Sequence, residues 1–438
     1  MIRRANLLTA ALAALALVSA PVAVRAGSMA LTGATVHTVS GPTLENATVV
    51  ITDGRIAAVG ADVSPPAGAT LVPCAGKHIY PGLIAANTIL GLVEVGSVLG
   101  TRDDNETGNI NPNIRAEVEI NPESDLLPVT RVNGVTSALS VPRGGAISGT
   151  SALIHLDGWT QEDMTVAKPV GLHVNWPSMS INRAWWETRT EEDQRKAREQ
   201  AVQAIHDAFE DARAYWKAHD AEGKAGIPRH DRDVKWDAMG RALRGEIPVM
   251  FHADALNQIR AVLRFVDEQK LKNVVLVGGD DAWMVTEELK ARDIAVVTGP
   301  ALSLPGRSYE AYDYGMALAA KLQAAGVRYC ISDGGGSTNA RNLPYEAAMA
   351  AAFGLPRDEA LKGITLYPAQ ILGVGDRLGS IETGKIADLI VTTGDPLEIE
   401  TQVEQVYING KPTSMETRQT RLFKKYDARP RGPRARKR

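Results

Sequence analysis

The chain is poor in cysteine and has no apolar run beyond its first 26 residues that is long enough to span a bilayer. Its two cysteines, Cys74 and Cys330, fall in different predicted elements. A disulfide between them is possible in an oxidising compartment, but the sequence does not show one, and neither has the spacing of a metal knuckle. The net charge of −3 and the pI near 6.3 give no sign of nucleic-acid binding. We therefore expect no nucleic-acid partner and no transmembrane segment.

Residues 1–26 have the pattern of a cleavable signal peptide. Arg3 and Arg4 give a positive start, residues 7–18 form a short apolar run, and residues 24–26 end in a small-residue cleavage site. A helix of the folded core is the alternative interpretation. The pattern predicts a periplasmic or secreted protein whose mature chain begins at Gly27.

The opposite end of the chain is strongly basic. Residues 421–438 carry nine Lys and Arg side chains and a single acidic residue, Asp427. Such a charge run predicts a solvated, disordered tail. Contact with an anionic membrane surface is the alternative.

Short strand patterns occupy both ends of the body. Residues 49–51 and 56–59 flank Asp53-Gly54, a strong signal for a two-residue hairpin turn. Residues 387–391 and 406–408 repeat the pattern near the other end. Neither set is large enough to form a sandwich alone. We expect residues 27–80 and 376–420 to pair into one small composite β-sandwich domain.

Between the two ends, apolar runs alternate with helical patterns, which predicts repeated βα units and an α/β fold. Residues 81–375 are slightly long for a (β/α)8 barrel, and the excess falls in residues 100–124 and 176–244. Barrel enzymes keep their chemistry just past the carboxyl ends of the strands. The candidate strands are residues 83–86, 135–141, 152–156, 170–174, 247–251, 273–277, 294–297 and 328–331.

The second insertion contains a helix signal. Thr190 begins a capping pattern, and an apolar stripe follows at helical spacing, which predicts packing against the core. Trp176 lies in the loop before this helix. It is either a wall of a substrate pocket or part of a hydrophobic plug, and the sequence leaves both open. The stripe consists of Ile205, Phe209, Ala212 and Trp216.

Residues 81–89, PGLIAANTI, resemble a motif of the metal-dependent amidohydrolase superfamily, Pro-Gly-Leu-Ile-Asp-x-His-x-His. The two His positions, which bind metal in that family, are Asn87 and Ile89 here. Residues 334–345 and 365–389 resemble the imidazolonepropionase-like branch. The resemblance implies a distorted (β/α)8 barrel and hydrolysis of a carbon–nitrogen bond.

The same resemblance identifies site residues at later strand ends. His252 stands where the family places a metal-binding His, and Asp333 matches the final Asp that contacts the metal and serves as general acid and base. Gly278 or Gly279, after the candidate strand of residues 273–277, replaces the family's second His. Three of the family's four His ligands are thus absent.

A reduced metal site remains compatible with these residues. A catalytic zinc takes three protein ligands and keeps one position for water. His173, at the end of a candidate strand, would complete such a set with His252 and Asp333. We expect one weakly held zinc or other divalent ion, or none. Asn87, Trp176 and Asn339 are the candidate substrate-binding residues, and the acidic residues Asp103, Asp104 and Glu106 are expected to be solvated, whereas Glu94 could lie at the mouth.

Two functions follow. The first is an exported amidohydrolase-like hydrolase that acts on a small amide-like substrate through Asp333 and His252. The second is an inactive periplasmic binding or scaffold protein that keeps the fold. The missing His ligands favour the second, and the retained His252 and Asp333 favour the first. The sequence does not indicate the substrate or the oligomeric state.

Overall fold

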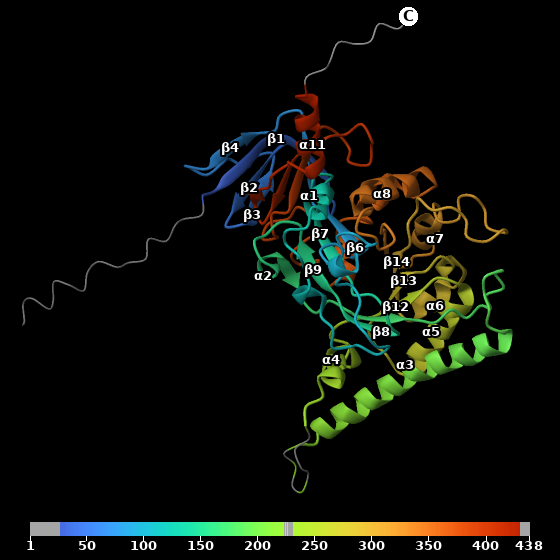
Figure 1. Cartoon of the computed structure of the whole chain (residues 1–438). Coiled ribbons are helices and arrows are strands. Elements are labelled where there is room, and N and C mark those ends of the chain that lie inside the picture. Colours follow the sequence, from blue (N-terminus) through green and yellow to red (C-terminus); the bar gives the residue numbers. More distant parts are fainter. Residues whose placement is uncertain (1–26, 223, 225, 227–230, 430–438) are drawn as a thin grey trace, which may run out of the picture.

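The computed structural model describes residues 27–222, 224, 226 and 231–429. The expected signal peptide, residues 1–26, lies outside them, as does the end of the basic tail. A sheet built from both chain ends lies at the top of Figure 1, and the remaining strands and helices lie below it. The long helix α3 (Glu191–His219) runs across the bottom of the same view.

Both chain ends contribute to one eight-stranded sheet, in the order β18-β17-β16-β5-β1-β2-β3, with β4 paired to β1. The two ends meet where β16 runs antiparallel to β5, with Leu389 opposite Pro81. A second layer that would make this sheet a sandwich stays a prediction. The bounds are β1 Met29–His37, β2 Thr43–Thr52, β3 Arg55–Gly60, β4 Thr70–Pro73, β5 His78–Pro81, β16 Leu389–Thr392, β17 Val403–Ile408 and β18 Lys411–Pro412.

The Asp53-Gly54 turn joins β2 and β3 as the sequence predicts. Both residues have positive φ, 51° and 77°, which matches the twist of a two-residue hairpin. Thr52 pairs with Arg55 across the turn. Glycine relieves the strain at the second position, where a side chain would also meet the carbonyl oxygen of Asn409 at 2.9 Å.

The central strands form two further sheets, of order β10-β9-β7-β6 and β15-β14-β13-β12-β11-β8. Strands β11 to β15 run parallel, as do β6 and β7. No pairing joins the two sheets within the described residues, so closure into one barrel stays a prediction. The bounds are β6 Leu83–Thr88, β7 Val135–Ser140, β8 Ile147–Thr150, β9 Ala152–His155, β10 Thr165–Ala167, β11 Leu172–Asn175, β12 Val249–Ala253, β13 Val274–Gly278, β14 Ala295–Thr298 and β15 Tyr329–Cys330.

One strand prediction is wrong in direction. Residues 152–156 were expected to be a parallel barrel strand, but β9 runs antiparallel to β7. Only six residues separate β7 from β8, too few for a parallel crossover, which needs about a dozen. The chain therefore turns back, and β8 pairs antiparallel with β11 before β9 pairs with β7.

Helices cover the central strands (Figure 1). Thr190 caps α3 by accepting a hydrogen bond from the Asp193 N–H, and the predicted stripe is buried except for Trp216, which is half-buried. The other helices are α1 Leu126–Arg131, α2 Gln161–Met164, α4 Val234–Leu243, α5 Leu256–Glu268, α6 Thr286–Ala291, α7 Leu318–Ala324, α8 Leu343–Ala352, α9 Arg357–Lys362 and α10 Leu366–Ile371.

The prediction of a disordered tail from residue 421 onward is wrong for its first part. Helix α11 spans Arg418–Asp427, and Thr417 caps it through a capping box. Arg418 and Arg421 reach Asp125 at 3.5 and 3.4 Å, so α11 lies beside α1 in Figure 1. Ion pairs from two arginines to Asp125 and a good N-cap thus order a segment whose composition alone suggested disorder.

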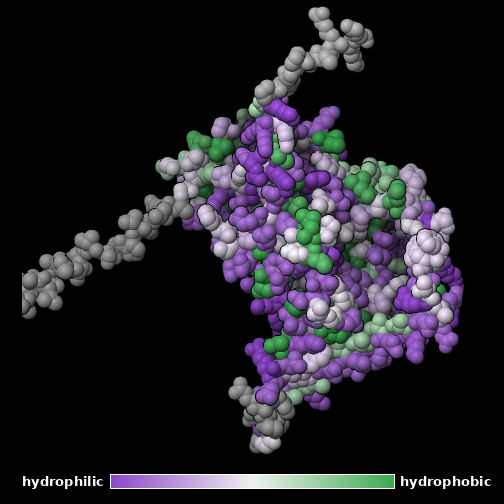
Figure 2. All heavy atoms as spheres, in the orientation of Figure 1, coloured by the Kyte–Doolittle hydropathy of each residue, from purple (hydrophilic) through white to green (hydrophobic). Residues whose placement is uncertain are grey.

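Both cysteines are free and buried, and they lie in different apolar clusters. The disulfide that the sequence left open does not form. No helix of the described residues is long and apolar enough to cross a membrane. The face shown in Figure 2 is mostly hydrophilic, with separate small apolar groups.

Candidate active site

The side chains expected to carry chemistry lie in or just after four strands of the two central sheets. Asn87 lies in β6, His173 in β11 and His252 in β12, while Asp333 follows β15. Parallel pairing aligns β11, β12 and β15 through their neighbours, so their ends meet at one edge. Arg143, which the sequence did not single out, joins them from the loop after β7.

Arg143 lies against Asn87. Its Nη2 donates hydrogen bonds to the Asn87 Oδ1 at 3.0 Å and to the Gly335 carbonyl oxygen at 3.1 Å. Asn87 is buried, with 7% of its surface exposed. Gly335 has a φ of +93°, and a Cβ there would lie 2.3 Å from Nη2. Only glycine therefore lets the guanidinium approach this turn.

The loop of residues 100–124 holds the main chain of Arg143. The Arg143 N–H donates to the carbonyl oxygen of Asp104. Asn105 and Arg143 also form an isolated parallel β-bridge. Asp104 is 4% exposed, and its Oδ1 accepts a hydrogen bond from the Arg102 Nε at 3.3 Å. The expectation that Asp104 is solvated is therefore wrong, because its loop packs against the chain after β7. Asp103 is exposed as expected.

His173 and His252 form a pair. The His173 Nδ1 and the His252 Nε2 lie 2.9 Å apart and share a hydrogen bond, so one ring donates and the other accepts. Burial lowers the pKa of His173 well below its usual value, and the charges of His252 and Arg143 add to this. Burial also lowers the pKa of His252 to about 3, with a further contribution from Arg143. Both rings are neutral at physiological pH.

Asp333 is a buried carboxylate, 5% exposed. Neither oxygen accepts a hydrogen bond from another residue within the described part of the chain. Burial raises the pKa of Asp333 to about 7, and the charge of Glu346 adds to this, while the residue's own amide and Arg143 oppose it. A buried acid with free oxygens is available to exchange a proton with a ligand.

The predicted three-ligand metal site does not match this arrangement. The described residues contain no group of three His, Cys, Asp or Glu side chains that could hold a metal ion. His252 Nε2 is engaged by His173, and the Arg143 cation disfavours further positive charge next to both rings. Members of the family are usually metal-dependent, but these donors do not fit the reduced site inferred from the sequence.

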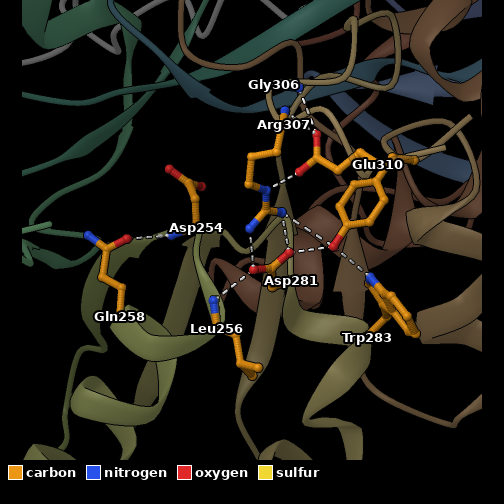
Figure 3. Close-up of polar contacts among 9 residues, drawn as sticks. Asp254, Leu256, Gln258, Asp281, Trp283, Gly306, Arg307 and Glu310 are labelled. Carbon is orange, nitrogen blue, oxygen red and sulfur yellow. Dashed lines mark hydrogen bonds and ion pairs between the residues drawn. The ribbon is translucent and has the colours of Figure 1, made fainter. Parts of the chain in front are cut away.

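A second replacement occurs at the end of β13. Gly278, which with Gly279 is one of the two candidates for the family His position, has a φ of +93°, and a Cβ there would meet the Asp254 Oδ1 at 2.0 Å. Burial raises the pKa of Asp254 to about 6, and the nearby Asp280 adds to this. Figure 3 shows the main-chain nitrogen of Asp254 donating to the Gln258 Oε1, at 3.0 Å. The missing imidazole therefore makes room for a carboxylate.

A charged network fixes the loop after β14. Figure 3 shows Arg307 between Asp281 and Glu310. Its Nη1 donates to the Asp281 Oδ2 at 2.8 Å, and Tyr314 donates to the same carboxylate through its hydroxyl. The Leu256 N–H also reaches the Asp281 Oδ2, at 2.8 Å. Asp281 thereby ties the start of α5 to the loop around residue 307.

The remaining predicted residues lie elsewhere. Trp176 is buried between Phe251 and Phe265, with ring centroids at 6.0 and 5.1 Å, which favours the plug over the pocket wall. Asn339 is exposed at the start of a short turn of helix. Glu94 is half-exposed and accepts a hydrogen bond from Asn121 at 3.3 Å.

Comparison with known proteins decides the family. The model of the amidohydrolase family matches residues 163–413, which is more than half of the chain. This chain belongs to the amidohydrolase family. The resemblance seen in its motifs is thereby confirmed, and membership supports hydrolysis of a carbon–nitrogen bond.

Individual relatives cover most of this amidohydrolase. It is 26% identical over 375 residues to the amidohydrolase tasK of Hapsidospora irregularis, which covers 79% of this chain and 37% of tasK. It therefore spans little more than a third of that relative. It is also 26% identical over 396 residues to an imidazolonepropionase of Brucella anthropi, covering 83% of this chain and 90% of the relative.

Solved structures share the fold. An amidohydrolase from Thermotoga maritima MSB8 superposes with a TM-score of 0.80 at 28% identity, covering 88% of this chain and 99% of that one. A prolidase solved with N-methylphosphonate-L-proline superposes with a TM-score of 0.53 at 18% identity, covering 88% and 99%. The second likeness shows the fold alone.

Proposed function

We propose that this amidohydrolase hydrolyses a carbon–nitrogen bond of a small amide-like molecule, with Asp333 as the group that carries the proton. The observation behind the proposal is the buried Asp333 carboxylate, which has no hydrogen bond from another described residue and lies past the end of β15. Family membership supplies the reaction class. A carboxylate in this state is suited to general base and then general acid catalysis.

The reaction would proceed in two steps. Water attacks the carbonyl carbon while Asp333 takes one proton from that water, which leaves a tetrahedral oxyanion. Asp333 then returns the proton to the departing nitrogen, and the carbon–nitrogen bond breaks. The products are a carboxylic acid and an amine, and Asp333 is again a carboxylate.

The histidine pair would orient the substrate. His252 is half-buried and is accessible from the strand ends, whereas His173 lies beneath it with 1% of its surface exposed. Their shared hydrogen bond fixes the His252 ring. A neutral, fixed imidazole can contact a polar substrate atom without adding charge.

A substrate screen tests this proposal. Purified protein would be incubated with N-acyl amino acids, dipeptides and cyclic amides, with and without added zinc, and released amine would be measured. Hydrolysis of at least one class is expected. No hydrolysis of any class, together with a tightly bound co-purified ligand, would refute the proposal in favour of the inactive binding protein, an alternative that family membership does not favour.

Export and a closed barrel complete the proposal. The signal-peptide pattern of residues 1–26 supports a periplasmic or secreted location. The parallel run β11 to β15 supports a barrel of the (β/α)8 type, with the shared end sheet as its companion domain.

A further inference from the structure

Arg143 is held in place through both its main chain and its side chain. Its main chain is tied to Asp104 and its side chain to Asn87 and Gly335. Burial lowers its pKa, and the charges of Asp104 and Asp333 oppose that shift. A guanidinium remains protonated in such surroundings, so a fixed positive charge acts on the proposed acid–base residue.

The bonds that position Arg143 do not neutralise it. Both side-chain partners are neutral oxygens, an amide and a main-chain carbonyl. Both bonds come from Nη2, so within the described chain the N–H groups of Nη1 and Nε keep no side-chain hydrogen-bond partner. A guanidinium has five donors in a planar fork, and the free ones suit a carboxylate or a tetrahedral oxyanion.

One family ligand position takes part in this contact. Asn87 stands where the first His of the motif would bind metal, and it instead accepts a hydrogen bond from Arg143. Gly335 removes the side chain that would block the guanidinium. One position that would have bound a metal cation thus contacts an organic cation instead.

We propose that the guanidinium of Arg143 takes the part of the metal in this amidohydrolase, by polarising the substrate carbonyl and stabilising the oxyanion. The inference rests on the proposed function, because it concerns the same hydrolysis. It assigns a second catalytic residue that the family motif does not contain. The ligand class is an oxyanion, either the tetrahedral intermediate or the carboxylate product.

Anion binding tests this proposal without turnover. Methylphosphonate, a tetrahedral anion, would be titrated by calorimetry into the metal-stripped full-length protein. Arg143→Gln should weaken binding about 30-fold or more, the scale for loss of a charge-assisted partner. Arg115→Gln removes the same charge from an exposed side chain that lies 3.8 Å from Glu117, and should bind as the wild type does. No binding by the wild type, or equal binding by Arg143→Gln, would overturn the proposal.

Two glycine variants test the position of the Arg143 guanidinium separately from its charge. Gly335→Ala keeps Arg143 but places a Cβ 2.3 Å from Nη2, so it should weaken methylphosphonate binding as well. Gly336→Ala adds a Cβ with nothing within 4 Å, and should leave binding unchanged. Thermal melting of both variants would check folding. Equal binding by both folded variants would contradict the proposed geometry.

Kinetics on any hydrolysed amide give an independent result. Arg143→Ala should lower kcat by about a hundredfold or more, as for loss of an oxyanion donor, and added guanidinium ion should restore part of it. If guanidinium ion gives no rescue and Arg143→Ala still binds methylphosphonate as the wild type does, the proposed catalytic role of Arg143 would be overturned. If the wild type binds methylphosphonate through Arg143 but hydrolyses no amide, the proposed function fails while the oxyanion site remains.

Discussion

The side-chain oxygen of Asn87 accepts a hydrogen bond from Arg143 at 3.0 Å, at a motif position where the family has a metal-binding histidine. This contact explains how the chain can retain Asp333 while it lacks most of the usual ligands. A fixed guanidinium and a free carboxylate that influence each other electrostatically would supply a positive charge and a proton carrier. Those are the two elements that amide hydrolysis needs from its surroundings.

The first prediction concerns metal content. Protein exposed to zinc and then to mild chelation should retain well below one ion per chain, because the donors next to Arg143 do not form a three-ligand set. Elemental analysis would measure this. Two firmly held ions per chain would show that other residues, such as Glu94 or Asp280, act as ligands.

The second prediction concerns the network around Asp281. Burial opposes its ionisation, but hydrogen bonds from Arg307 and Tyr314 outweigh this and lower its pKa. A lowered pKa stabilises the fold above the unfolded value, and that stability is lost as the pH falls through the folded value. Asp281→Asn should therefore lower the free energy of unfolding by about 1–3 kcal/mol at pH 7.

Urea denaturation at pH 7 and at acid pH would measure the effect of this substitution. The difference between wild type and Asp281→Asn should shrink as the pH falls below about 4. Asp293→Asn removes a carboxylate bound to Arg328 on the surface and should change little. A constant difference at every pH would show that charge is not its cause.

The third prediction concerns the sheet shared by the chain ends. Ile390 is fully buried in β16, opposite Tyr80 of β5. Ile390→Ala should cost about 2–5 kcal/mol of unfolding free energy, because it leaves a cavity. Ile399, 77% exposed in the same region, provides the control, and Ile399→Ala should have almost no effect. Equal melting temperatures for the two variants would contradict the packing.

The fourth prediction concerns export. N-terminal sequencing of the protein recovered from outside the cytoplasm should begin at Gly27, after removal of residues 1–26. An intact Met1 on the mature protein would refute the signal peptide. Cleavage elsewhere within the first 30 residues would change the predicted cleavage site but would still support a signal peptide.

The sequence was informative where a site residue lies at the end of a strand and within a family motif. His252 and Asp333 could be selected because the family that the chain resembles has site residues at these strand ends. His173 was selected as a possible metal ligand, but its hydrogen bond with His252 could not be predicted, because that bond depends on the alignment of β11 with β12. Hydrophobic periodicity predicts that a segment forms a strand, but not which other strand pairs with it.

Arg143 could not be found in this way. It follows Pro142 in a short loop, and nothing in the local sequence separates it from arginines that lie in solvent. Its place depends on the loop of residues 100–124, which packs along the chain from Arg143 to Thr150. Asp104 was misassigned for the same reason, because an acidic loop suggests solvent until its tertiary contacts are known.

The most direct measurement is the rate of amine release by wild type and by Asp333→Asn on the same amide substrate. The account predicts that Asp333→Asn is slower by about a hundredfold or more, the usual scale of acid–base catalysis. Asp103→Asn, an exposed acidic residue of the first loop, should react like the wild type. Equal rates for wild type and Asp333→Asn would contradict the central claim that Asp333 carries the proton.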